Sequence, residues 1–181
     1  MSGFLTLAAR CAIIGGVLRI VASFIPYIPE SPWLEGYYAV IDICLMFGLI
    51  GIFAQTVDLV GVWGKSGWAI AMMGQASIIG PDARMFGIDF YMAGSAILLT
   101  GLAIWSLALL RGGVMRAAAG WWLTGGALAV ATILSGIAGL VPAAGVALGL
   151  GFVLAGRACL AALQPAKFSM DKCGLPPLRG P

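Results

Sequence analysis

The sequence predicts an all-α, polytopic integral membrane protein that folds as a compact, glycine-rich bundle of about six transmembrane helices. Hydrophobic residues make up 61% of the 181 residues and charged residues only 9%, whereas a soluble domain carries roughly 25% charged residues. Each crossing of a bilayer needs ~20 mostly apolar residues. Residues 1–163 are therefore expected to form a single transmembrane domain, which leaves no room for a soluble one.

The first span is predicted over residues 5–25. It is expected to be retained rather than cleaved as a secretory signal, because residues 1–9 carry no basic side chain and Arg19 interrupts the apolar region. Pro26 and Pro29 should end the helix, since proline lacks the amide donor that a helix needs.

The second and third spans are predicted over residues 37–57 and 62–79. Trp33 and Tyr38, near the start of the second span, are typical of the aromatic belt at a membrane surface. The third span is the weakest, because its apolar run is short and Lys65 lies near its beginning. The alternative is a re-entrant third segment with five full spans.

The remaining spans are predicted over residues 86–110, 117–139 and 141–163. Asp82 is expected to act as the N-cap of the fourth span. There its carboxylate would accept hydrogen bonds from the free backbone amides, and the helix dipole would stabilise its negative charge. The turn between the last two spans carries no charge, which predicts an antiparallel hairpin. Residues 164–181 contain basic residues and prolines and are expected to form a flexible cytoplasmic tail.

The chain contains 27 glycines, and those in the sixth span follow a pattern. Gly145, Gly149 and Gly156 fall on one helix face, as small residues do where two membrane helices approach closely. Tight helix packing is the expected role of these three residues.

The distribution of basic residues predicts the orientation of the bundle. Most Lys and Arg residues outside the apolar runs fall on one side, and the positive-inside rule assigns that side to the cytoplasm. We therefore expect a bacterial cytoplasmic membrane protein with both termini in the cytoplasm. The residues on this side are Arg10, Lys65, Arg111, Arg116, Lys167, Lys172 and Arg179, whereas the other side has Arg84 among Glu30, Glu35 and Asp82.

With this orientation, several polar side chains fall at one level in the outer half of the membrane. Ionised side chains are costly in the bilayer centre, so they should face one another or a watery cleft. Arg19 and Asp42 are predicted to form a salt bridge, whereas Arg84 and Asp89 are five residues apart and should not pair within one helix. The cluster consists of Arg19, Asp42, Gln75, Arg84 and Asp89, with Tyr38 and Tyr91 beside it.

The cluster has two interpretations. In the structural one, the charges hold helix register and topology. In the functional one, Asp42, Asp89, Gln75 and Arg19, with Tyr38 and Tyr91, line a cavity that opens to the periplasm and binds a small or amphipathic ligand. A protonatable carboxylate in such a cavity would suit a small transporter.

The favoured function class is a non-catalytic accessory subunit that packs against a larger membrane complex, against itself, or around lipids or pigments. No cofactor is predicted, although a bound lipid or other apolar molecule would be consistent with this function class. The sequence has no histidine, no G-x-S-x-G and no H-E-x-x-H motif, so an enzyme is the least favoured class. No cluster of Lys and Arg with aromatic residues indicates nucleic-acid binding.

Overall fold

The computed structural model describes residues 2–26, 28, 31–79, 84–85 and 88–163. The protein is an all-helical membrane bundle, and five of the helices are long and apolar enough to cross a bilayer. A two-residue antiparallel pair, β1 (Arg84–Met85) and β2 (Ile88–Asp89), joins the third helix to the fourth. The helices are α1 (Ser2–Ala22), α2 (Pro32–Thr56), α3 (Gly61–Ile78), α4 (Phe90–Arg111), α5 (Arg116–Ser135) and α6 (Leu140–Leu163).

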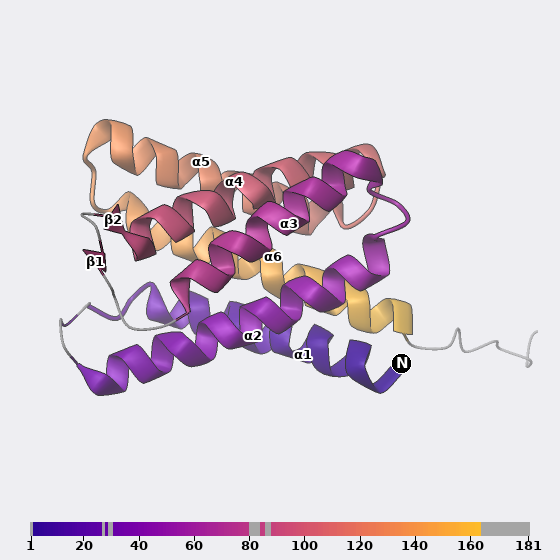
Figure 1. Ribbon diagram of the computed structural model, residues 1–181, viewed down its shortest axis with the longest axis horizontal. Helices are drawn as coiled ribbons and strands as arrows, with labels where there is room; N and C mark the ends of the chain where they lie inside the picture. Colours follow the sequence, from indigo (N-terminus) through magenta and orange to yellow (C-terminus); the bar gives the residue numbers. More distant parts are fainter. Residues whose placement is uncertain (1, 27, 29–30, 80–83, 86–87, 164–181) are drawn as a thin grey trace, which may run out of the picture.

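The third helix, α3, is the one whose hydropathy does not place it among the five candidate spans. It is nevertheless a continuous helix of 18 residues, about 27 Å long at 1.5 Å per residue. It runs between the two ends of the bundle beside α4 (Figure 1). Its length is thus close to that of the other helices, although only five helices are candidate spans by hydropathy.

Several helix boundaries differ from those expected. α1 ends at Ala22 rather than at 25, because Pro26 disfavours helical geometry in the residue before it. α2 begins at Pro32 rather than at 37, since proline is tolerated in the first helical turn. α5 ends at Ser135 rather than at 139, because Gly136 adopts a left-handed conformation with φ 68° and caps the helix.

The start of α4 also differs from the prediction. The helix begins at Phe90, not at 86, and its N-cap is Asp89, whose side chain accepts from the Met92 amide at 3.0 Å. Asp82 was expected in this role, but it precedes a hairpin rather than a helix, and its own placement lies outside the described residues. In the hairpin Asp89 stands directly opposite Arg84.

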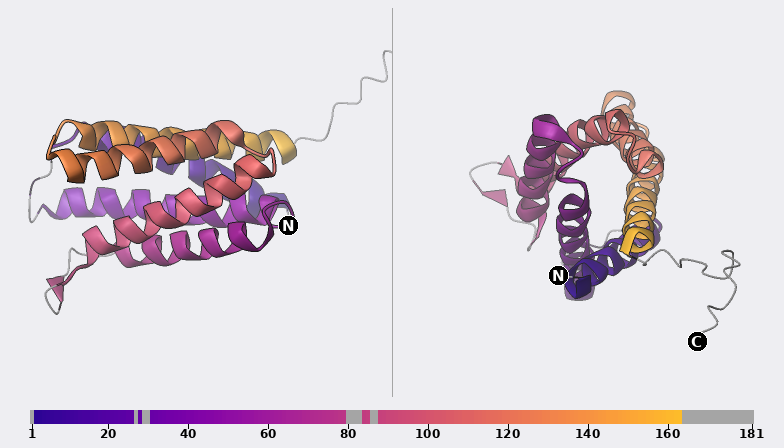
Figure 2. Two further views of the ribbon diagram at one scale, coloured as in Figure 1. Left: turned by 90° about the horizontal axis from the view of Figure 1, so that it is seen from above. Right: turned by 90° about the vertical axis from the view of Figure 1, so that its right-hand side faces the viewer.

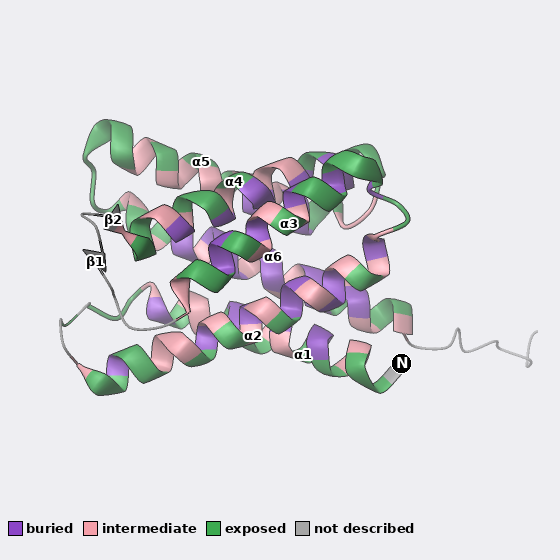
Figure 3. Ribbon diagram, viewed as in Figure 1, coloured by how far each residue is buried: buried purple, intermediate pink, exposed green. Residues whose placement is uncertain are grey.

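The six helices form a closed ring (Figure 2). Each helix packs against the next one in the sequence, and α6 closes the ring by packing against α1. Exposed residues are found on all six helices (Figure 3). They include many large apolar ones, such as Ile133 and Leu134, which are 73% and 82% exposed. An apolar exterior is the arrangement that a lipid environment favours.

Glycines allow the close approach of helices around the ring. Gly149 lies so near α1 that an added Cβ would stand 2.5 Å from the Gly16 carbonyl oxygen, and at Gly156 an added Cβ would stand 2.7 Å from that of Ala9. Gly145 faces Ser23, so all three glycines singled out in the sixth span face α1. Gly74 similarly lies against the backbone of α4 at Leu98.

Aromatic side chains from five helices fill part of the interior. They form a continuous series of ring contacts, which we call the aromatic column. Trp105 and Trp122 stack with ring centroids 5.6 Å apart, and both are almost completely buried. The column consists of Trp68, Phe53, Trp105, Trp122 and Phe152, contributed in turn by α3, α2, α4, α5 and α6.

The two ends of the bundle differ in charge. We call the end that carries β1, β2 and the turn between α5 and α6 the hairpin end (Figure 1). We call the opposite end the terminal end, because α1 begins and α6 ends there. The terminal end carries exposed basic side chains, and these include one that the sequence analysis did not count, Arg157. The full set is Arg10, Lys65, Arg111, Arg116 and Arg157.

The glycine contacts predict a contrast between two substitutions. Gly74→Ala should destabilise the bundle by about 1–3 kcal/mol, because the new methyl group overlaps the α4 backbone at Leu98. Gly126→Ala is the control, since nothing lies within 4 Å of its added Cβ, and alanine should be neutral or stabilising there. Unfolding in mixed detergent micelles measures both, and equal stability of the two variants would contradict close packing of α3 on α4.

Candidate functional site

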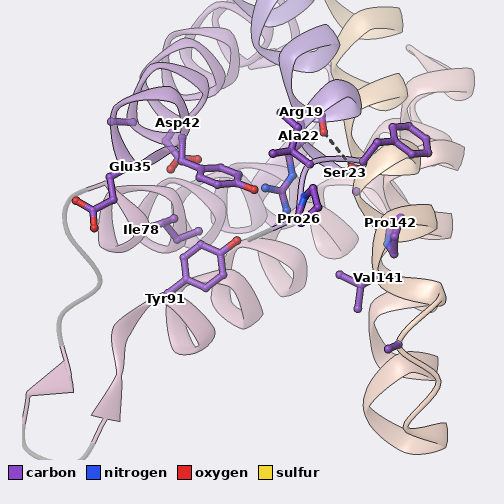
Figure 4. A pocket seen from close by; sticks show the side chains of 16 residues that line it. Arg19, Ala22, Ser23, Pro26, Glu35, Asp42, Ile78, Tyr91, Val141 and Pro142 are labelled. Carbon is purple, nitrogen blue, oxygen red and sulfur yellow. Dashed lines mark hydrogen bonds between the residues drawn. The ribbon is translucent and has the colours of Figure 1, made fainter. Parts of the chain in front are cut away.

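A cavity of about 800 Å³ opens at the hairpin end of the bundle. The ends of α1, α2, α3, α4 and α6 and the turn after α5 all contribute to its wall (Figure 4). Ligand sites in proteins commonly measure about 300–1,000 Å³ and combine an apolar wall with a few polar groups. The polar lining residues are Arg19, Ser23, Glu35, Tyr38, Asp42 and Tyr91.

Helical spacing on α1 and α2 explains how these groups come to one place. On α2, Glu35, Tyr38 and Asp42 follow each other at intervals of three and four residues and therefore share one face. On α1, Arg19 and Ser23 are four residues apart and share a face in the same way. Side chains from two antiparallel neighbours thus converge on the cavity.

Arg19 enters the cavity from α1 and has unused donor capacity. Its Nε atom is buried and has no hydrogen-bond partner. Arg19 and Asp42 both line the cavity, yet in the described structure they do not form the predicted salt bridge, although the positive charge acts on Asp42 through space. The guanidinium is directed into the cavity (Figure 4).

Asp42 is instead held by a neutral partner. The Nε2 atom of Gln75 donates to the Asp42 carboxylate oxygen Oδ1 at 3.1 Å and lies 3.4 Å from the Asp42 carbonyl oxygen. Gln75 is completely buried, so this hydrogen bond joins α2 to α3 beneath the cavity. The remaining face of the carboxylate is left for the cavity.

Two tyrosines add hydroxyl groups to the wall. Tyr91 reaches in from the first turn of α4, with its hydroxyl directed toward the side on which Arg19 lies (Figure 4). Tyr38 lines the cavity from α2. The neighbouring Tyr37 does not join them, because its hydroxyl donates to the Leu18 carbonyl oxygen at 3.0 Å and ties α2 to α1.

The structure therefore divides the predicted cluster. Arg19, Tyr38, Asp42 and Tyr91 line the cavity, whereas Gln75 lies behind Asp42, Asp89 caps α4 and the side chain of Arg84 lies outside the described structure. Two further polar lining residues, Glu35 and Ser23, were not among the predicted site residues. Their spacing was the signal that could have identified them, because Glu35 is seven residues from Asp42 and Ser23 is four residues from Arg19.

An apolar groove of about 500 Å³ adjoins the cavity between α5 and α6. It shares two residues with the cavity, Phe24 and Pro142, and extends along α6 as far as Leu150. The groove is lined by Phe24, Trp121, Leu128, Gly139, Pro142, Ala143, Val146, Ala147 and Leu150.

The polar groups of the cavity are one guanidinium, two carboxylates and three hydroxyls. Within the described ranges, no three His, Cys, Asp or Glu residues come together to hold a metal ion. Fold and site define a helical membrane bundle with a charged cavity at one end. Comparison of the chain with protein families, curated proteins and solved structures finds no match.

The Gln75 contact predicts another contrast in stability. Gln75→Leu should destabilise the bundle by about 1–3 kcal/mol, because the buried side of the Asp42 carboxylate loses its donor. Gln55→Leu is the matched control: the Nε2 atom of Gln55 is buried without a partner, so its loss should be neutral or stabilising. In an Asp42→Ala background the effect of Gln75→Leu should shrink, and strict additivity in this double-mutant cycle would contradict the contact.

Proposed function

We propose that the protein is a membrane binding protein that holds a small amphipathic molecule in the cavity at its hairpin end. The observation that carries the proposal is the separation of Arg19 and Asp42, which face one cavity with opposite charges and do not neutralise each other by a direct contact. Arginine left with free donors in an apolar setting is costly, and a ligand that accepts from it would remove that cost.

Binding from one side is better supported than transport. A transporter must expose its site alternately to both sides of the membrane. The aromatic column fills the interior with closely packed rings, and Trp105, Trp122 and Phe152 are each at most 1% exposed. We therefore propose that the ligand binds in the cavity and does not pass through the bundle.

An accessory subunit in a larger complex is the second candidate. That expectation relied on glycine-rich faces as surfaces for partner helices. The faces at Gly149 and Gly156 are already covered by α1, and the face at Gly74 by α4, inside the same bundle. The exposed apolar exterior still suits either lipid or a partner, so co-purification separates the two functions.

We further propose that the protein resides in a bacterial cytoplasmic membrane, with its terminal end in the cytoplasm and its cavity open to the outside. The basic side chains exposed at the terminal end support this orientation by the positive-inside rule. The acidic Glu35 at the cavity lies at the opposite end.

Co-purification tests the binding function. The wild-type protein, purified in mild detergent and extracted with organic solvent, should release one amphipathic species at about one molecule per chain by mass spectrometry. Arg19→Gln should reduce its amount at least about tenfold, because the cavity loses its positively charged guanidinium. Arg10→Gln is the control, since Arg10 is exposed on the same helix at the other end.

A ligand retained equally by both variants would contradict a role for the cavity. A second polypeptide present at a fixed ratio, with no small molecule, would instead support the accessory-subunit function.

Site-directed labelling tests the orientation. In a chain with its native cysteines replaced by alanine, Glu35→Cys should react with a membrane-impermeant maleimide on intact cells, because the cavity mouth faces outward. Lys65→Cys, exposed at the terminal end, should react only after the membrane is permeabilised. The reverse pattern would place the cavity in the cytoplasm.

A further inference from the structure

We infer that the ligand is a zwitterionic membrane phospholipid, whose head group binds in the cavity and one of whose chains lies in the apolar groove between α5 and α6. This inference rests on the proposed function and specifies its ligand. Three features carry it: the two opposite charges of the cavity, the continuity of the cavity with the groove, and the lipid-facing position of the groove.

The charges select the head group. Arg19 lines the cavity with its guanidinium, a group that binds phosphate strongly. Asp42 presents the carboxylate face that Gln75 does not occupy, and Glu35 adds a second negative charge at the mouth. A head group with only a negative charge would be repelled by these carboxylates. A head group with only a positive charge would be repelled by Arg19. A head group with both charges satisfies the two walls together.

The groove provides a place for the chain. Phe24 and Pro142 line both hollows, so they form the boundary between the cavity and the groove. Phe24 is 72% exposed, which leaves its ring free to change rotamer at this boundary. From Pro142 to Leu150 the groove follows α6 for about 12 Å at 1.5 Å per residue.

The position of the groove favours a lipid over a water-soluble molecule with the same head group. Its wall is made of apolar side chains, and Trp121, which is 40% exposed, lies on it. Other apolar side chains of the same helix, Ile133 and Leu134, are exposed as well. A chain can therefore enter laterally from the bilayer while the head group occupies the cavity.

The test uses a single-chain phosphoethanolamine lipid with bromine atoms on its chain, which quench nearby tryptophan. The purified full chain is titrated in detergent, and the signal of Trp121 is obtained as the difference between wild type and Trp121→Phe. This difference should fall saturably with added lipid. Arg19→Gln should weaken binding at least about tenfold, whereas Arg10→Gln, the exposed control on the same helix, should leave it unchanged.

Two comparisons test the head group and the chain separately. The corresponding phosphoglycerol lipid, which lacks the ammonium, should bind wild type at least about tenfold more weakly, and Asp42→Asn should abolish this preference while keeping an acceptor for Gln75. Ala143→Phe should fill the groove and weaken binding, whereas Ala161→Phe, exposed farther along α6, should not.

Each part can be overturned independently of the proposed function. Equal affinity for the two head groups would contradict selectivity for a zwitterionic head group. Competition by free glycerophosphoethanolamine at concentrations similar to those of the lipid would show that the chain does not contribute to affinity. Absence of Trp121 quenching would show that the lipid chain does not lie in the groove. If co-purification yields an amphipathic ligand of another class, this inference fails and the proposed function stands; if it yields no ligand, both fail.

Discussion

The cost of placing an ionised side chain in hydrocarbon, about 2.5–3.5 kcal/mol at the centre of a span, is the constraint on which the architecture depends. Arg19 and Asp42 lie within helices that are otherwise oily, and the ring turns both of them toward one cavity instead of toward lipid. Gln75 satisfies the inner side of the carboxylate with a buried amide. The closed ring of helices and the polar cavity are thus two results of the same requirement.

Close packing is what allows the ring to close. In a bilayer, helix association depends on van der Waals contact more than on the hydrophobic effect, and the glycines of α1, α3, α4 and α6 bring backbones within reach of one another. The interface between α2 and α3 relies on side chains instead: Trp68 donates to the Leu49 carbonyl oxygen at 3.2 Å and stacks on Phe53 with centroids 3.9 Å apart. Ring closure therefore combines glycine contacts with specific polar and aromatic ones.

The sequence was sufficient to predict the helical membrane bundle, because apolar runs of about 20 residues have few other solutions. It also identified four cavity residues by their common depth: Arg19, Tyr38, Asp42 and Tyr91. It failed where tertiary packing decides. The partner of Asp42 proved to be the neutral Gln75 on the neighbouring helix α3. The helix α4 begins only after a hairpin whose two-residue strands are too short to show periodicity. The groove between α5 and α6 could not be predicted, because its lining residues are apolar like the rest of the two spans.

The aromatic column gives the folded ring an optical signature of its own. Trp105 and Trp122 stack at an interplanar angle of 22°, and their indole nitrogens are buried without hydrogen-bond partners. Two chromophores held so close in a fixed, chiral arrangement should produce a strong near-ultraviolet circular dichroism signal, which disappears when side-chain packing is lost even if the helices persist. Because the column draws on five helices, this single spectrum reports the integrity of most of the bundle without any attached label.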